Sequence, residues 1–356
     1  MNFELVYSEG NKIECTNMIN LIEKLTYEKS KIDEFPTKWD KVKKNINIYE
    51  YIYTSQNINK NISNIIPISR SYFKLIEMVK EYKLIDKSDI RVFCMAEAPG
   101  GFIQSLLNNK NIKEIGATTL ISENKEVPHW NRIILSSPLV KLYHGINEDG
   151  DLCNIANLLS IIKKFGKNSI DLITGDGGFD YSEDYNKQEQ NSLPLIYSEI
   201  FLALNLQKEG GNFICKFFDI FFKNTIQLLY LLSKCYRKIF IHKPSVSRAS
   251  NSEKYIVCLD FKGYNKEIVN LLFHYFKDNN LDIQIDSNFE KELIKINQLY
   301  IDHQIFQINK GIQLIKSRKI SNRPSHFQIR SAIEWCEKYN VPMNKTCYYL
   351  HRTFPH

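Results

Sequence analysis

Short apolar runs bounded by turn residues alternate with amphipathic stretches through the middle of the chain. The runs predict buried strands, at residues 91–96, 114–118, 140–143, 170–173, 210–218, 238–242 and 253–261. Helical spacing of apolar residues predicts helices, at residues 69–80, from residue 103, at 195–206 and at 266–282. Strands that alternate with helices are typical of a parallel α/β sheet. About ten residues without a helical pattern precede the last strand, which favours an antiparallel return because a parallel crossover needs about a dozen residues or more.

The predicted fold is therefore α/β, with a Rossmann-like, seven-stranded, mostly parallel sheet and an antiparallel last strand. It occupies residues 67–282. Residues 1–66 form a predicted helical extension, in which residues 45–65 are either a packed helix or an ordered arm. Residues 283–356 form a second, mostly helical extension with a basic run from Lys316 to Arg330.

The composition is that of an ordinary globular protein with an excess of positive charge. The chain has 356 residues, a net charge of +7 and a pI near 8.8, which favours an anionic partner. None of the eight cysteines are paired at metal-ligand spacing and most lie in apolar runs, which predicts reduced core residues and no metal site. The N-terminus lacks a signal-peptide pattern, and no apolar run reaches the roughly 18 residues that span a bilayer. We expect a cytoplasmic location without membrane association.

Charged residues lie at the ends of several predicted strands. Asp176 follows a buried strand, Lys216 lies near the carboxyl end of the next strand, and Glu253 begins the antiparallel one. The carboxyl ends of parallel strands form the ligand crevice of such sheets, so these side chains are expected to converge there. Lys74 joins them if its helix lies beside the first strand. The alternatives are a capping or turn role for Asp176, a structural salt bridge for Lys216 and a solvated Lys74.

The first predicted strand runs into the turn Glu97-Ala98-Pro99-Gly100-Gly101-Phe102, and a helix follows. Strand, glycine turn and helix in this order are typical of a nucleotide-type binding turn, because glycines let a ligand approach the backbone. The fingerprint G-x-G-x-x-G and the P-loop are both absent. The acidic Glu97 suits an amino group or ribose hydroxyls instead, although any βα turn can carry proline and glycine. After the third strand, three residues either accept hydrogen bonds from a ribose or an adenine amino group or form a solvated acidic loop: Asn147, Asp149 and Asp151.

Five stretches match, in the same order, the motifs of one family. They are Ser69-Arg-Ser-Tyr-Phe-Lys74, Ala96–Phe102, Asp171–Asp180, Gly210–Lys216 and Lys243–Tyr255. The chain resembles the FtsJ-like (RrmJ-like) 2′-O-ribose methyltransferases, and within them the viral and eukaryotic mRNA cap branch. The family commonly has aspartate where this chain has Glu97.

The resemblance implies an S-adenosylmethionine-dependent methyltransferase fold, with the methyl donor held by the turn from Glu97 to Phe102. It also implies a Lys-Asp-Lys-Glu tetrad, at Lys74, Asp176, Lys216 and Glu253. A ribose 2′-hydroxyl is a poor nucleophile, so transfer needs alignment with the sulfonium methyl and a base. We expect Lys216 to be that base, with its pKa lowered by burial and by Lys74. Asp176 and Glu253 would hold the lysines, with Asp176 also near the sulfonium.

The implied substrate is RNA, with the first transcribed nucleotides of capped mRNA as the leading expectation. Four basic residues flank the expected crevice and either contact phosphates or are ordinary solvated charges: Arg70, Lys243, Arg248 and Lys254. The C-terminal basic run is either a solvated face or an extension of an RNA track, and an aromatic pair there can stack on a 7-methylguanine. Other capping or transcription proteins are candidate partners.

Three other functions stay open. They are 2′-O-methylation of ribosomal or transfer RNA, a non-catalytic RNA-binding subunit, and a dinucleotide oxidoreductase, which the missing phosphate fingerprint disfavours. A viral source would place the protein in a viral factory or a virion, and the nucleus is a further alternative.

Overall fold

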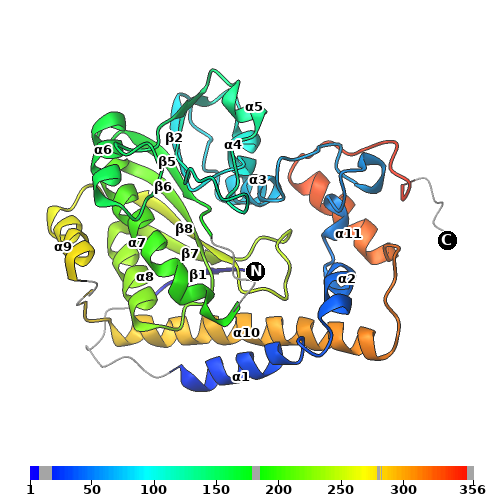
Figure 1. Ribbon diagram of the computed structural model, residues 1–356. Coiled ribbons are helices and arrows are strands. Elements are labelled where there is room, and N and C mark those ends of the chain that lie inside the picture. The colour runs from blue at the N-terminus through cyan, green and yellow to red at the C-terminus, as the bar shows by residue number, and fades with distance from the viewer. Residues whose placement is uncertain (8–17, 179–184, 279–280, 282, 351–356) are drawn as a thin grey trace. The chain divides into compact units, whose positions relative to one another are not determined.

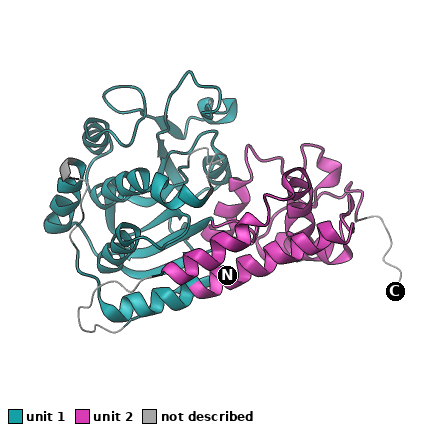
Figure 2. Ribbon diagram, turned by 60° about the horizontal axis from the view of Figure 1, so that its bottom comes forward, with its two compact units in different colours: residues 1–18, 82–243, 253–297 teal, residues 19–81, 244–252, 298–356 magenta. Residues whose placement is uncertain are grey.

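The computed structural model describes residues 1–7, 18–178, 185–278, 281 and 283–350. The described chain divides into two units (Figure 2). Unit 1 comprises Met1–Met18, Tyr82–Lys243 and Glu253–Asn297, and unit 2 comprises Ile19–Glu81, Pro244–Ser252 and Gln298–His356. The units draw on interleaved segments, whereas the sequence predicted three consecutive parts, and that division along the sequence stays a prediction.

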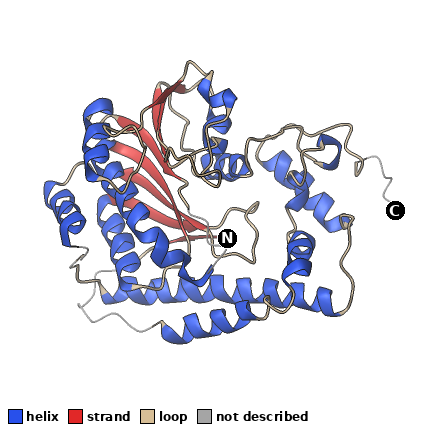
Figure 3. Cartoon of the chain, in the orientation of Figure 1, coloured by secondary structure: helices blue, strands red, loops and turns tan. Residues whose placement is uncertain are grey.

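Unit 1 contains one eight-stranded sheet, drawn in red in Figure 3. Its strands are β1 (Asn2–Glu4), β2 (Ile90–Met95), β3 (Ile112–Ala117), β4 (Val140–Leu142), β5 (Ile170–Gly175), β6 (Gln207–Phe217), β7 (Tyr236–His242) and β8 (Lys254–Phe261). The order is β1-β7-β8-β6-β5-β2-β3-β4. Strands β2 to β7 are parallel, and β8 lies antiparallel between β6 and β7. The predicted α/β class and the antiparallel last strand are confirmed.

The sequence did not predict the short edge strand β1. It pairs antiparallel with β7, Phe3 opposite Ile241. Three residues are too few for a periodic pattern, so only the tertiary pairing reveals this strand.

The register of the sheet brings the expected charged residues to one edge. Gly175 pairs with Cys215 across β5 and β6, so Asp176 and Lys216 are the next residues on neighbouring parallel strands. Phe217 pairs with Lys254 across β6 and β8, which puts the start of β8 beside the end of β6. We call this side of the sheet, where the parallel strands end, the carboxyl edge.

Helices cover both faces of this sheet (Figure 1). Helices α6 (Ile155–Phe165), α7 (Gln188–Leu206) and α8 (Lys223–Cys235) cover one face, and α4 (Gly101–Leu106) and α5 (Arg132–Leu135) cover the other. Helix α7 follows the short turn η3 (Tyr185–Lys187) and is almost entirely buried, because α6, α8 and α9 (Lys266–Asp278) all contact it. This burial explains why its sequence lacks a polar face.

Unit 2 is mostly helical. It contains α1 (Ile19–Ser30), α2 (Pro36–Ile46), η1 (Glu50–Ile52), η2 (Ile58–Lys60), α3 (Ser71–Glu81) and α11 (His326–Lys338), and α10 (Ser287–Lys316) passes into it from unit 1. Its core includes Phe73, Trp335 and Tyr339. Residues 45–65 form an ordered arm with two short 3₁₀ turns, which decides between the two predicted alternatives.

Most cysteines are buried, as predicted, and those in the described chain are free thiols. Cys153 is exposed, so the prediction of a core role is wrong for this residue. Cys15 lies outside the described residues. No described helix combines the length and the apolar character that crossing a membrane requires.

Candidate active site

Asp176 and Lys216 meet at the carboxyl edge of the sheet. The ammonium Nζ of Lys216 lies 3.4 Å from Asp176 Oδ1 and donates a 2.8 Å hydrogen bond to the backbone carbonyl of Asp176. Both side chains are 13% exposed, so the pair is largely shielded and still reachable from outside. Buried charges are stable when they are paired in this way. The pair is a place where a reacting group can meet an amine and a carboxylate together.

Tyr255 completes the contacts of Asp176. Its buried hydroxyl donates a 2.7 Å hydrogen bond to Asp176 Oδ1, and its ring lies 6.0 Å from the ring of Phe102. Burial and the negative charge of Asp176 raise the pKa of Tyr255 well above its usual value, so the hydroxyl stays a donor. Sequence reasoning placed Tyr255 in a motif without a role. The register that places Tyr255 opposite Lys216 across β6 and β8 is visible only in the structure.

Glu199 on α7 is a further charged group that the sequence did not predict. It is 1% exposed, and its Oε2 accepts a 3.1 Å hydrogen bond from the thiol of Cys215. Burial raises the pKa of Glu199 to about 7, against the opposing effect of the Cys215 hydrogen bond and the charge of Lys216. Glu199 thus lies behind the two strand ends that carry the Asp176–Lys216 pair.

The glycines around Asp176 make room for these neighbours. A Cβ at Gly175 would lie 2.5 Å from Glu199 Oε2, and one at Gly177 would lie 2.9 Å from its Oε1. A Cβ at Gly178 would lie 3.1 Å from Lys216 Nζ. The motif Thr-Gly-Asp-Gly-Gly is therefore explained by a carboxylate on one side of the turn and an ammonium on the other. Phe179 and Asp180, the last residues of the matched motif, lie outside the described residues.

The predicted effect of burial on Lys216 needs a correction. Burial is the largest single influence on the pKa of Lys216 and lowers it, as expected. The negative charges of Asp176, Glu253 and Glu199 together outweigh burial, so the pKa is raised above its ordinary value. The expectation of a lowered pKa is wrong for the chain without substrate, in which Lys216 is an ammonium.

The predicted binding turn lies beside this pair. Glu97 is 3% exposed, and its Oε1 accepts a 2.7 Å hydrogen bond from the backbone amide of Phe102, in the first turn of α4. Burial raises the pKa of Glu97 well above its usual value, and the charge of Asp176 adds to this rise. Within the described chain, neither Glu97 Oε2 nor the hydroxyl of buried Thr118 has a hydrogen-bond partner. Buried polar atoms normally have partners, so these two fit a polar ligand such as S-adenosylmethionine.

Hydrogen bonds of Asn157 hold the loop that follows β4. Asn157, fully buried on α6, donates 2.7 Å and 2.9 Å hydrogen bonds to Asp149 Oδ1 and to the carbonyl of Asp151. Its own Oδ1 accepts from the amide of Asn147. Asn147 is exposed, whereas Asp149 is half-buried and its Oδ1 is occupied by the hydrogen bond from Asn157. The loop is therefore more than a solvated acidic segment, and contact with the methyl donor stays a prediction for all three residues.

The other two members of the expected tetrad are placed differently. The charge of Glu253 acts on Lys216, and its backbone carbonyl accepts a 2.7 Å hydrogen bond from Lys243 Nζ. Glu253 therefore joins the Asp176–Lys216 pair electrostatically. Lys74 is half-buried on α3 of unit 2, so its membership stays a prediction.

The four expected RNA contacts all have partners inside their own unit. In unit 2, Arg70 and Arg248 lie 3.6 Å and 3.4 Å from the carboxylate of buried Glu50. In unit 1, Lys254 is 4% exposed and donates to the carbonyl of Phe218. Lys243, bonded to Glu253, is likewise buried. These are not ordinary solvated charges, and a role in RNA binding stays a prediction for each of them.

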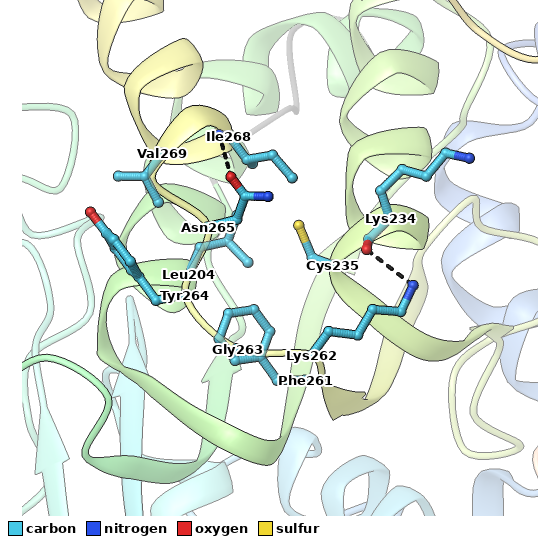
Figure 4. A pocket seen from close by; sticks show the side chains of 10 residues that line it. All are labelled: Leu204, Lys234, Cys235, Phe261, Lys262, Gly263, Tyr264, Asn265, Ile268 and Val269. Atoms are coloured by element: carbon cyan, nitrogen blue, oxygen red, sulfur yellow. Dashed lines mark hydrogen bonds between the residues drawn. The ribbon is translucent and has the colours of Figure 1, made fainter.

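A cavity of about 240 Å³ lies at the opposite edge of the sheet (Figure 4). It is bounded by the end of α8, the end of β8 and the start of α9. Lys262 donates a 3.1 Å hydrogen bond to the carbonyl of Lys234, whose own Nζ lies 5.0 Å from the ring centre of Tyr230. Its lining residues include two lysines but no carboxylate or imidazole, so the cavity lacks the amine–carboxylate pairing of the carboxyl edge.

The chain matches the family model described as FtsJ-like methyltransferase over residues 67–261. These residues are more than half of the chain, and the chain belongs to the FtsJ-like methyltransferase family. The resemblance seen in the sequence motifs is thereby confirmed at the level of the family.

Three relatives carry related names. The chain is similar to cap-specific mRNA (nucleoside-2′-O-)-methyltransferase 1 of Caenorhabditis elegans, with 30% identity over 66% of this chain and 28% of the relative. The protein of the same name from Homo sapiens is 26% identical over 73% and 33%. An inactive cap-specific mRNA (nucleoside-2′-O-)-methyltransferase 1B of Caenorhabditis briggsae is 29% identical over 62% and 29%. The chain thus spans about a third or less of these relatives, and one of them is named inactive at similar identity, so similarity alone does not establish activity.

Proposed function

We propose that this protein transfers the methyl group of S-adenosylmethionine to a ribose 2′-hydroxyl of RNA, within the first transcribed nucleotides of capped mRNA. The observation that carries the proposal is the shielded Asp176–Lys216 pair, 3.4 Å apart at the carboxyl edge of a sheet of this family. The names of the relatives support the capped substrate.

The methyl donor supplies an electrophilic methyl group on a sulfonium. Glu97 Oε2 and Thr118 Oγ1, which have no partner among the described residues, are suited to hold polar groups of this ligand. Asp176, beside them on the carboxyl edge, is suited to its positive charge. We assign the turn from Glu97 to Phe102 and the loop with Asn147, Asp149 and Asp151 to this ligand.

Lys216 is the group that we assign to the 2′-hydroxyl. The oxygen forms a bond to the methyl carbon as the carbon–sulfur bond breaks, and the hydroxyl proton passes to the amine of Lys216. A placed base of this kind typically accelerates a reaction by about 10²–10⁴-fold. Lys216 must first lose a proton, because its pKa is raised by Asp176, Glu253 and Glu199. The positive charge of a bound donor and of Lys74 would offset these carboxylates.

Two substrates and one non-catalytic role compete with this proposal. The test is transfer of labelled methyl from S-adenosylmethionine to capped RNA, to the same RNA without its cap, and to ribosomal or transfer RNA. Transfer only to capped RNA, resistant to alkali at the modified ribose, is the expected result. Transfer to structured RNA without a cap would reassign the substrate. S-adenosylmethionine binding in a calorimeter without transfer to any RNA would favour a non-catalytic subunit.

Two of the four predicted phosphate contacts, Lys243 and Lys254, have a separate test. Replacing Lys243 and Lys254 by glutamine should weaken RNA binding and flatten its salt dependence if these ammonium groups also reach phosphates. An unchanged salt slope would leave them with only the intramolecular partners described above.

A further inference from the structure

The positive charge of the chain is concentrated in one segment of unit 2. The whole chain has 47 Lys and Arg against 40 Asp and Glu. Residues 303–333 contain six of these cations and no acid, so the other residues hold 41 cations against 40 acids. Nearly all of the net charge of +7 therefore lies in the second half of α10, the following loop and the first part of α11 (Figure 1).

These cations are available to a partner. Lys316, Arg318, Lys319 and Arg323 are all exposed, and none of the four forms an ion pair with another residue that the structure describes. Lys316 has a local explanation, because a cation in the last turn of a helix interacts favourably with its dipole. Arg318, Lys319 and Arg323 come after the end of α10, where the interaction with the helix dipole is weak.

Two large aromatic side chains are exposed in the same segment. Phe306 on α10 and Phe327 at the start of α11 are each 63% exposed. Phe306 and Lys316 are about 15 Å apart along the helix axis, so the segment can accommodate several nucleotides. In the sequence the two rings flank the four cations, and exposed aromatic rings near unpaired cations are the combination on which single-stranded nucleic acids bind, with bases stacked and phosphates neutralised.

Hydrogen bonds anchor the loop that carries the cations to neighbouring segments of unit 2. The carbonyl of Ser321 accepts a 2.7 Å hydrogen bond from Asn45, and the amide of Arg323 donates to Ser321 Oγ. Ser325 and Gln328 form a capping box at the start of α11, and Gln328 also donates to the carbonyl of Asn47. A preformed surface loses little conformational entropy when it binds.

We propose that Phe306, Lys316, Arg318, Lys319, Arg323 and Phe327 form a surface that binds single-stranded RNA downstream of the modified nucleotide. We call it the α10–α11 surface. The inference rests on the proposed function for the identity of the ligand. It assigns the C-terminal segment a separate task, which is to retain the body of a long RNA and not to act on the ribose.

The first experiment measures RNA binding directly. The quadruple variant K316Q/R318Q/K319Q/R323Q is compared with wild type by fluorescence anisotropy on a single-stranded RNA of about 16 nucleotides, across a salt series. The matched control K110Q/K113Q/K163Q/K266Q removes the same charge from exposed lysines of unit 1. We expect the salt slope to fall by about 0.7 for each phosphate that the first variant no longer neutralises. The control should keep most of the wild-type slope.

The aromatic contribution is tested by F306A/F327A. Removal of each ring should weaken binding on the order of tenfold, because a base can no longer stack there, with the salt slope unchanged. Both rings are exposed, so an unaltered unfolding midpoint is expected and serves as the check on folding.

Methyl transfer then separates this surface from the proposed function. On a long capped RNA the quadruple variant should raise KM by about tenfold or more and leave kcat unchanged. On a capped RNA of very few nucleotides, both constants should equal those of wild type. If wild type transfers no methyl but its RNA binding depends on this surface, the proposed function fails and the inference stands. If the quadruple variant binds RNA and has a KM as wild type does, the inference is wrong. The exposed cations would then be suited to an acidic protein partner instead.

Discussion

Two clusters of buried charge, one in each unit, show how differently the same residue types are used. At the carboxyl edge of unit 1, Asp176 and Lys216 are paired, yet buried carboxylate oxygens of Glu97 and Glu199 have no partner within the described chain. In unit 2, Glu50 is 1% exposed and both of its oxygens are engaged, by Asn47 and by Arg248.

The arginines of the second cluster are also paired, although Arg248 Nε is buried without a hydrogen-bond partner among the described residues. Arg70 donates to the carbonyls of Tyr53 and Val246, and both Arg70 and Arg248 are 28% exposed. A buried carboxylate with both oxygens paired, as in Glu50, is structural, because removing a partner leaves an uncompensated charge. Incomplete satisfaction and raised pKa values mark the first cluster as the one suited to chemistry. The comparison shows that a basic residue near a family motif can be a structural partner of a buried acid, so its position in the sequence alone does not identify it as an RNA contact.

The largest expected effect is on catalysis at the first cluster. K216R should lower methyl transfer by at least about 10²-fold, because a guanidinium stays protonated and cannot accept a proton. Labelled methyl transfer measures the loss, and calorimetry should show S-adenosylmethionine binding close to wild type. K208R, on the same strand and exposed, is the matched control and should be fully active. Near wild-type transfer by K216R would remove Lys216 from the role of base.

The second cluster should respond in stability. E50Q leaves Arg70 and Arg248 without their counter-charge and should lower the free energy of unfolding by about 2–4 kcal/mol. Urea unfolding measures the change. E334Q removes the acid of an exposed pair with Arg330 and should cost no more than about 0.5 kcal/mol. If E50Q is as stable as wild type but binds RNA more weakly, Arg70 and Arg248 belong to the RNA path after all.

Glu199 offers a test of stability against pH within the first cluster. Its pKa in the folded chain is raised to about 7 from an ordinary value of 4.5, so the folded state binds a proton that the unfolded state releases between these values. Stability from this group is complete below pH 4.5 and is lost as pH rises toward 7. E199Q does not titrate and should therefore gain up to about 3 kcal/mol relative to wild type between pH 4.5 and 8.

Urea unfolding at several pH values checks this expectation. E209Q, a change at an exposed glutamate, should follow the pH dependence of wild type. If the stability of E199Q depends on pH in the same way as that of wild type, the Glu199 carboxyl does not titrate between pH 4.5 and 8.

The effect of a single pH unit on the rate is expected to be smaller than the loss in K216R. Since the pKa of Lys216 is raised, only a small and growing fraction of the amine is neutral near pH 7. The constant kcat/KM should rise by about tenfold per pH unit between pH 7 and 9 without a plateau. A plateau at neutral pH would show that the base has an ordinary or lowered pKa, or that another step limits the rate.

Much of the sheet was predictable from the sequence. The strands β2, β5 and β7 lie within two residues of their predicted positions, because short buried strands appear as continuous apolar runs. The antiparallel direction of β8 followed from the short loop before it. These features depend on local composition and on chain length, which the sequence states directly.

The candidate site was predictable only in part. Asp176 and Lys216 follow from their positions at strand ends, and the structure brings them together. Glu199 lies in an apolar helix that gives no sign of contact with Cys215, and Tyr255 was one tyrosine of twenty. The pairing of Glu50 with Arg248 joins residues 198 positions apart.

The sequence by itself determined the class of fold, the edge of the sheet where charge gathers and the family to which the chain belongs, since these depend on periodic patterns and short motifs. Only the tertiary structure decided which charges are satisfied, which oxygens stay unpartnered and in which direction each pKa moves. The physical reason is that burial and electrostatic energy depend on groups close in space, and in this protein those groups come from segments far apart in the chain.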